Sequence, residues 1–95
     1  SSIVIGDNTI IGEGVKIYDH NHIYKDPTIP IKNQGYSSDE IVIGENCWVG
    51  SNVVILKGVH IGNHSIIGAG NIVHKDVPEN SILLAKQEII LKKIN

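Results

Sequence analysis

An aliphatic residue recurs at every sixth position through two long stretches of this 95-residue chain. A period of six fits neither an amphipathic helix, which repeats near 3.6 residues, nor a single strand, which repeats at two. A short fixed period is typical of repeat architectures. The pattern therefore predicts a very short strand followed by a corner, repeated along the chain. The repeat positions, all Ile or Val, are Ile5, Ile11, Ile17, Ile23, Ile43, Val49, Ile55, Ile61, Ile67 and Val73.

Three strand-and-corner units would close one triangular turn of 18 residues. Strand side chains alternate between the two faces, so the residue two positions before each aliphatic residue also faces inward. Cys47 is one of these inward residues, and buried cysteine behaves as a small hydrophobe rather than as a nucleophile. Glycines such as Gly44 and Gly50 follow most repeat positions and suit the corners. We predict an all-β solenoid of stacked parallel turns over residues 1–80.

The repeat is interrupted once and ends before the C-terminus. Ile43 follows Ile23 by twenty residues, and residues 24–40 contain Pro27, Pro30 and Gly35. Loops of this length in compact domains are usually functional or disordered, so we predict that residues 24–40 leave the coil. Residues 81–95 form a tail, apolar and then basic, for which a strand start is favoured. No capping segment precedes the first repeat, so either the chain is part of a longer protein or that end is covered.

The amino-acid composition of the chain argues against several classes of function. The net charge is −2, which gives no reason to expect binding to nucleic acid or to an anionic membrane. The single cysteine excludes an intrachain disulfide framework. No signal peptide or membrane span is visible in the sequence, and the cytoplasm is the expected location.

The repeats, together with WVGSNVVILKGVHIGNHSIIGAGNIVHKDVP and the corner YDHNH before the loop, resemble a known family. They are similar to the left-handed parallel β-helix (hexapeptide-repeat) acyltransferases, and in particular to the branch that O-acetylates sugars: galactoside, maltose and polysaccharide-pathway acetyltransferases. The resemblance extends from Ile3 to about Ala85. It implies a left-handed coil, acetyl-CoA as the donor, a homotrimer, and direct acetyl transfer without a metal.

Such a reaction needs a general base, because a sugar hydroxyl is a poor nucleophile near neutral pH. Histidine suits this role, since its pKa lies near the operating pH. The resemblance assigns the base to His20. Asp19 or a backbone carbonyl could hold its tautomer, and His22 is either an acceptor contact or an alternative base. Asp19, His22 and Tyr24 are the expected acceptor-binding residues.

The resemblance also implies where coenzyme A binds, in a groove between neighbouring subunits beside the coil corners. His20 of one subunit would then meet coenzyme A bound against the next. The sequence departs from the family after the coil, where a G-x-P-A-K/R ending is missing, and Lys86 or Lys92 could replace its basic group. The expected coenzyme A contacts are Trp48, Ser51, Gly68, Ala69, His74 and Lys75.

Two other functions remain open at this stage. A γ-carbonic-anhydrase-like protein would bind zinc through three histidines, and His60 and His64 with one other could imitate that set. A non-catalytic structural β-helix is the second alternative. Outward apolar residues predict stacked pairs, Trp48 over Ile66 among them, and such faces on a small domain favour self-assembly. The acceptor sugar and the acyl chain length are not specified by the sequence.

Overall fold

The computed structural model describes residues 2–94, whose regular structure is β apart from one short 3-10 helix, so the all-β prediction is confirmed. The elements are β1 (Ile3–Ile5), β2 (Ile10–Ile11), β3 (Lys16–Ile17), β4 (His20–His22), η1 (Ile31–Asn33), β5 (Tyr36–Ser38), β6 (Ile41–Ile43), β7 (Trp48–Val49), β8 (Val54–Ile55), β9 (His60–Ile61), β10 (Ile66–Ile67), β11 (Ile72–Val73) and β12 (Ile82–Leu83).

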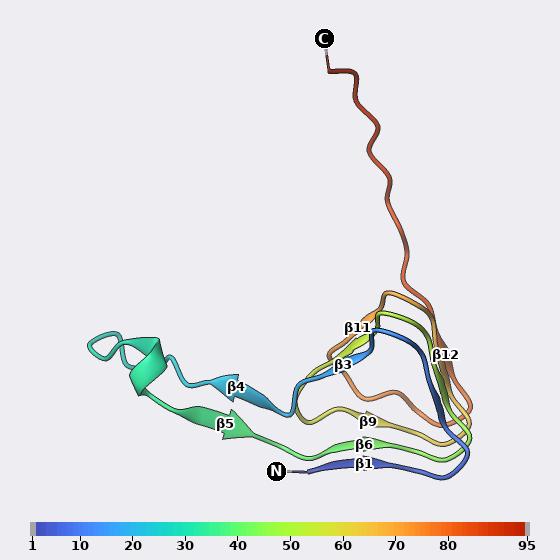
Figure 1. Ribbon diagram of the computed structural model, residues 1–95, viewed down its shortest axis with the longest axis horizontal. Coiled ribbons are helices and arrows are strands. Elements are labelled where there is room, and N and C mark those ends of the chain that lie inside the picture. Colours follow the sequence, from blue (N-terminus) through green and yellow to red (C-terminus); the bar gives the residue numbers. More distant parts are fainter. Residues whose placement is uncertain (1, 95) are drawn as a thin grey trace.

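Three parallel sheets form the three sides of a triangular coil (Figure 1). Their strand orders are β1-β6-β9, β12-β10-β7-β2 and β11-β8-β3. Trp48 pairs with Ile66 and Val54 with Ile72, so equivalent residues of these turns lie eighteen positions apart. This confirms the stacking that the six-residue period predicts.

The core is the column of repeat residues inside the coil. Ile43, Ile55 and Ile67 are fully buried, with 0% of each side chain exposed. Each such residue contributes about 1.5–3 kcal/mol to folding by leaving water. Cys47 is buried in the same column, as predicted, and its Sγ lies 3.3 Å from the Gly62 carbonyl oxygen. Among residues 2–94, the buried core therefore consists mainly of branched aliphatic residues and includes no aromatic side chain.

The corners between strands require special backbone conformations. Asn46 and Asn52 adopt positive φ angles of 55° and 58°, a region that asparagine tolerates better than most residues. At the buried Gly50 the constraint is space: a Cβ there would lie 2.6 Å from the backbone nitrogen of Ala69 on the next turn. Only glycine allows the two turns to approach this closely at that corner.

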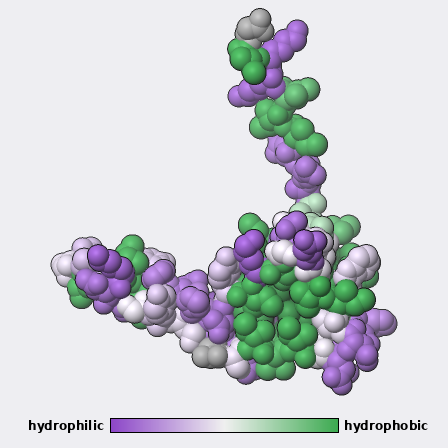
Figure 2. Space-filling model, viewed as in Figure 1, coloured by the Kyte–Doolittle hydropathy of each residue, from purple (hydrophilic) through white to green (hydrophobic). Residues whose placement is uncertain are grey.

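The first turn of the coil has one uncovered end. Ile5 is 46% exposed although it occupies the same repeat position as the fully buried Ile43. The reason is that β1, β2 and β3 pack against a turn on one side only. Apolar side chains accordingly gather at this end of the coil in Figure 2.

Between the first and second turns the chain makes an excursion. Ile3 pairs with Ile41, thirty-eight residues apart rather than eighteen, so twenty additional residues lie between the turns. Within this segment β4 and β5 pair antiparallel, and the hairpin extends away from the coil (Figure 1). We call residues 20–38 the arm. Its tip is closed by Gln34 Nε2, which donates to the Asp26 carbonyl oxygen at 2.8 Å.

The start of the arm corrects two sequence predictions. The excursion begins at His20 rather than at residue 24, so His20 lies on a strand of the arm and not on a coil corner. Ile23 has the spacing of a core position, yet it lies on the arm and is 37% exposed. Its backbone N–H donates to the Gly35 carbonyl oxygen at 3.0 Å, and this pairing across the arm replaces pairing along the coil.

The last turn is shorter than the others. Ile66 pairs with Ile82, sixteen residues on, and Val77 bridges to Ile61. The tail contains β12 at Ile82–Leu83, while residues 84–94 form no helix or strand. Residues 1 and 95, at the limits of the predicted segments, lie outside the described residues. Within residues 2–94, no helix is both long and apolar enough to cross a membrane.

Candidate active site

The base of the arm brings Asp19 and His20 together. His20 Nδ1 lies 3.0 Å from Asp19 Oδ1, and this hydrogen bond is the main cause of a pKa for Asp19 below its ordinary value of 3.8. An ionised carboxylate only accepts hydrogen bonds, so Nδ1 is the donor in this pair, and in the neutral form of the ring Nε2 is then the acceptor. The His20 side chain is half exposed. The pair therefore directs Nδ1 toward the carboxylate and leaves Nε2 on the other side of the ring.

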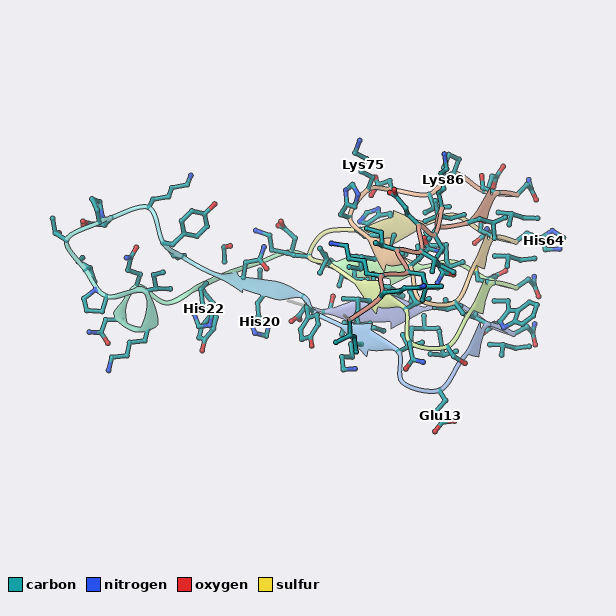
Figure 3. All side chains as sticks on the ribbon, turned by 90° about the horizontal axis from the view of Figure 1, so that it is seen from above. Glu13, His20, His22, His64, Lys75 and Lys86 are labelled. Carbon is teal, nitrogen blue, oxygen red and sulfur yellow. The ribbon has the colours of Figure 1, made fainter. Side chains whose placement is uncertain are left out.

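Two further rings, those of His22 and Tyr36, belong to this cluster. The Tyr36 ring centroid lies 5.1 Å from that of His20, with the ring planes at 87°, and 4.7 Å from that of His22. His20 and His22 project from the same side of the arm (Figure 3), as alternate residues of a strand must. We call Asp19, His20, His22 and Tyr36 the arm cluster.

A lysine from the coil fixes the other edge of the arm. Lys57 Nζ donates to Ser37 Oγ at 2.9 Å and lies 3.8 Å from Asp39 Oδ2. Between this lysine and the arm is a hollow of about 450 Å³ that His22 and Tyr24 also line. Two of the predicted acceptor-binding residues, His22 and Tyr24, thus share one hollow, whose lining does not include His20.

The residues predicted to bind coenzyme A fall into two groups. Trp48, Ser51, Gly68 and Ala69 line a hollow of about 290 Å³ where the sheet of β7 and β10 meets a corner. His74 and Lys75 line a separate hollow of about 330 Å³ on the last turn. Lys75 and Lys86 both lie toward the last turn of the coil (Figure 3). The group around Trp48 forms a continuous surface, and the other two contacts lie apart from it.

One chain does not bring the arm cluster and the Trp48 group together. The sheet that contains β7, β10 and β12 forms the side of the triangle opposite the corner from which the arm leaves (Figure 1). Neither of the two coenzyme A hollows includes His20. Within one chain, the two halves of the predicted site therefore lie apart.

The sequence predictions did not include Tyr36, Ser37 and Lys57. A signal for the first two was available: HNH and YSS are short segments that flank a stretch rich in proline and glycine, which is typical of a long hairpin. Such a hairpin places Tyr36 opposite His22. No local pattern marks Lys57, because its contact depends on how the arm leaves the coil.

The side chains do not gather as a metal site would require. Within residues 2–94, no group of three or more His, Cys, Asp and Glu side chains is placed to hold a metal ion. His60 lies on β9, whereas His64 follows at the next corner with a φ of 61°.

Comparison with known proteins places the chain in a family. Residues 40–75 match the family described as bacterial transferase hexapeptide (six repeats). The galactoside O-acetyltransferase of Escherichia coli (strain K12) is 39% identical over 99 residues, which cover 99% of this chain and 45% of that protein. WbbJ of the same strain, named as a candidate O-acetyl transferase of lipopolysaccharide biosynthesis, is 37% identical over 101 residues, 99% of this chain and 52% of its own length.

The chain belongs to the bacterial transferase hexapeptide family. It spans about half the length of these two hexapeptide relatives. Among solved structures, a galactoside acetyltransferase in complex with coenzyme A matches this hexapeptide coil with a TM-score of 0.77 and 44% identity, over 84% of this chain and 39% of that one. A hexapeptide-repeat acetyltransferase of Vibrio cholerae O1 biovar eltor, complexed with acetyl coenzyme A, also has a TM-score of 0.77, with 34% identity over 84% of this chain and 43% of that one.

Proposed function

We propose that this protein transfers an acetyl group from acetyl-CoA to a hydroxyl of a sugar or polysaccharide precursor, with His20 as the general base. The observation that carries the proposal is the hydrogen bond between Asp19 Oδ1 and His20 Nδ1, which leaves Nε2 available as a base. It occurs on a coil similar to acetyltransferases whose structures contain coenzyme A or acetyl coenzyme A. A left-handed winding of the coil is part of the same proposal.

In the proposed reaction, His20 Nε2 takes the proton of the acceptor hydroxyl while its oxygen attacks the thioester carbonyl carbon. The resulting tetrahedral intermediate collapses as the carbon–sulfur bond breaks. The imidazolium then returns its proton to the leaving thiolate, so the products are the acetyl ester and free coenzyme A. Asp19 stabilises the imidazolium and keeps the proton on Nδ1 between turnovers. No acyl-enzyme and no metal take part.

The donor would lie along the Trp48 group of one copy and meet His20 of another, in a homotrimer. Separation of the two halves within one chain supports this arrangement. So does the outward apolar stripe on the same sheet, in which Ile10, Trp48 and Ile82 are all more than half exposed. Ser51, Gly68 and Ala69 would contact the pantetheine arm, while His74 and Lys75 extend the site toward the phosphates.

The acceptor would occupy the hollow beside the arm that His22, Tyr24 and Lys57 line. Its lining includes His22, which lies on the same strand as His20 and supports this role, and the hollow offers both an aromatic ring and polar groups to a sugar. The names of two relatives support a sugar as the acceptor. One is named a galactoside O-acetyltransferase, and the other is named as a candidate O-acetyl transferase of lipopolysaccharide biosynthesis.

The most direct test mixes the full chain with acetyl-CoA and a panel of sugars and nucleotide sugars, and measures release of free thiol. We expect release that depends on the sugar, and a roughly 10²- to 10⁴-fold lower rate in His20→Ala, the usual range for loss of a general base. His60→Ala is the matched control, because it removes an exposed imidazole from β9. Sugar-independent thioester cleavage, or equal rates in the two variants, would refute the proposal.

A second experiment tests whether each active site is formed by two copies of the chain. Ala69→Trp would block the donor hollow, and His20→Ala would remove the base, so each variant alone should be inactive. Co-assembly of the two should restore part of the activity, since some interfaces then combine an intact donor face with an intact His20. If mixed assemblies form but regain no activity, the site does not span two copies.

A further inference from the structure

Tyr36 occupies a specific place in the arm. The antiparallel register sets Tyr36 directly opposite His22, and His20 is paired with Ser38, two residues beyond Tyr36. Such diagonal neighbours on one face of a sheet lie within reach of aromatic side chains. The ring of Tyr36 accordingly meets both imidazoles, edge to face with His20 and tilted against His22.

The His20 imidazole has little else to hold it. The buried core residues all belong to the coil, and the His20 side chain is half exposed on the arm. Its bond to Asp19 fixes which nitrogen carries the proton. A single hydrogen bond still allows the ring to swing about the line from Nδ1 to Oδ1. A second contact at an angle to this line is needed to fix the plane of the ring.

We propose that Tyr36 is the positioning residue that sets the plane of the His20 imidazole and so directs Nε2 toward the acceptor. The inference rests on the proposed function, because it assigns to Tyr36 an effect on that reaction. Tyr36 takes no part in proton transfer. It acts through His20 with its ring, whose faces and edges attract a second ring at right angles.

Tyr36 is itself held from both sides. Ser37, the next residue, accepts a hydrogen bond from Lys57, and Gly35, the residue before, accepts one from the backbone N–H of Ile23. At the base of the arm the backbone N–H of Asp39 donates to the Asp19 carbonyl oxygen at 3.1 Å. These contacts tie the strand that carries Tyr36 to the one that carries His20, so the two rings keep their relative position.

The test compares Tyr36→Phe, which keeps the ring, with Tyr36→Ile, which removes it but retains a strong strand former. An aromatic pair of this kind corresponds to roughly a two- to tenfold effect on rate. We therefore expect kcat to fall roughly two- to tenfold in Tyr36→Ile, with an unchanged KM for acetyl-CoA, and to stay near the wild-type value in Tyr36→Phe. Ile31→Ala, at the tip of the arm, is the control for a general loss of order in the arm, and its kcat should stay near the wild-type value.

NMR of the imidazole provides a second readout that does not depend on activity. Removal of the ring in Tyr36→Ile should shift the carbon-bound proton signals of His20, and Tyr36→Phe should leave them in place. Unmoved His20 signals in Tyr36→Ile would overturn the proposal. An equal loss of kcat in both variants would also overturn it, because the hydroxyl rather than the ring would then matter.

The role of Tyr36 can be wrong while the proposed function is right, and the two outcomes are distinguishable. Full kcat in Tyr36→Ile, together with an inactive His20→Ala, would remove the role of Tyr36 and leave His20 as the base. Full activity in His20→Ala would instead refute the proposed function itself.

Discussion

Lys57 Nζ donates a hydrogen bond to Ser37 Oγ at 2.9 Å, and this contact joins the second turn of the coil to the base of the arm. The lysine side chain is three-quarters buried, so its position is well defined. Asp39 lies 3.8 Å away but is largely exposed, and exposed ion pairs contribute little. The hydrogen bond to Ser37 is therefore the main side-chain link between the rigid coil and the strand that carries Tyr36.

Replacing Lys57 with Met should loosen the arm and leave the coil intact. Methionine keeps an apolar stem but loses the donor, and a hydrogen bond that involves a charged group contributes about 1.5–3 kcal/mol. We expect faster proteolytic cleavage within residues 20–38, a lower kcat, and a loss of less than about 3 kcal/mol in the unfolding free energy of the coil. Lys32→Met, on the exposed η1 at the tip, should change none of the three. Equal protease sensitivity in both variants would show that Lys57 does not anchor the arm.

The Asp19–His20 hydrogen bond predicts a pH dependence that can be measured directly. The pKa of Asp19 lies below its ordinary value of 3.8, first because His20 hydrogen-bonds to its carboxylate. A depressed carboxyl pKa means that the interaction is complete above the ordinary value and is lost as the pH falls through the lowered one. Carboxyl NMR should thus give a pKa below 3.8 in the wild type and a rise toward 3.8 in His20→Ala.

Asp26 offers an internal control for this titration. Its pKa is also lowered, by hydrogen bonds from the side chain and the backbone N–H of Thr28. His20→Ala should leave the Asp26 pKa unchanged, whereas Thr28→Ala should raise it and leave Asp19 alone. A rise of the Asp19 pKa in Thr28→Ala would mean that the whole arm rearranges. The Asp19 pKa would then not report on its hydrogen bond to His20 alone.

The coil could be predicted from the sequence because one physical requirement repeats. Every inward position of a stacked turn must be apolar, and Ile43, Ile55 and Ile67 are all fully buried at the predicted spacing. The same spacing predicts which outward residues stack, and Trp48 does pair with Ile66. Local periodicity was sufficient here, since each turn contacts only its neighbours.

The arm could be predicted only in part. Ile23 continues the period of six, so its spacing alone cannot reveal that its backbone pairs with Gly35 instead of with the next turn. The contact of Tyr36 with His20 depends on a chain reversal between them, and that of Lys57 with Ser37 depends on the direction in which the arm leaves. Residue types marked His20 as chemically useful, but three-dimensional register decides what orients it.

The degree of burial in the core column predicts that the same substitution, Ile→Val, lowers the free energy of unfolding by different amounts at different repeat positions. Ile→Val in a packed core usually costs about 0.5–1.5 kcal/mol. Ile55→Val removes a methyl group from a fully buried side chain, and we expect a loss in this range. Ile5→Val, at the same repeat position but 46% exposed, should cost less than half as much in this chain. Denaturant unfolding measures both, and equal costs would show that Ile5 is covered in solution.

The outward stripe on the sheet of β2, β7, β10 and β12 predicts self-association. Ile10, directly paired with Trp48, is 64% exposed and takes no part in the proposed site. If a second copy covers this stripe, Ile10→Glu would bury an unpaired charge there, which is costly in an apolar contact. We expect sedimentation to show a trimer for the wild type and mostly monomer for Ile10→Glu at the same concentration, with activity lost in parallel. Lys16→Glu, exposed on the neighbouring sheet, is the control for added negative charge. A fully active monomer, in either protein, would rule out a site shared between copies.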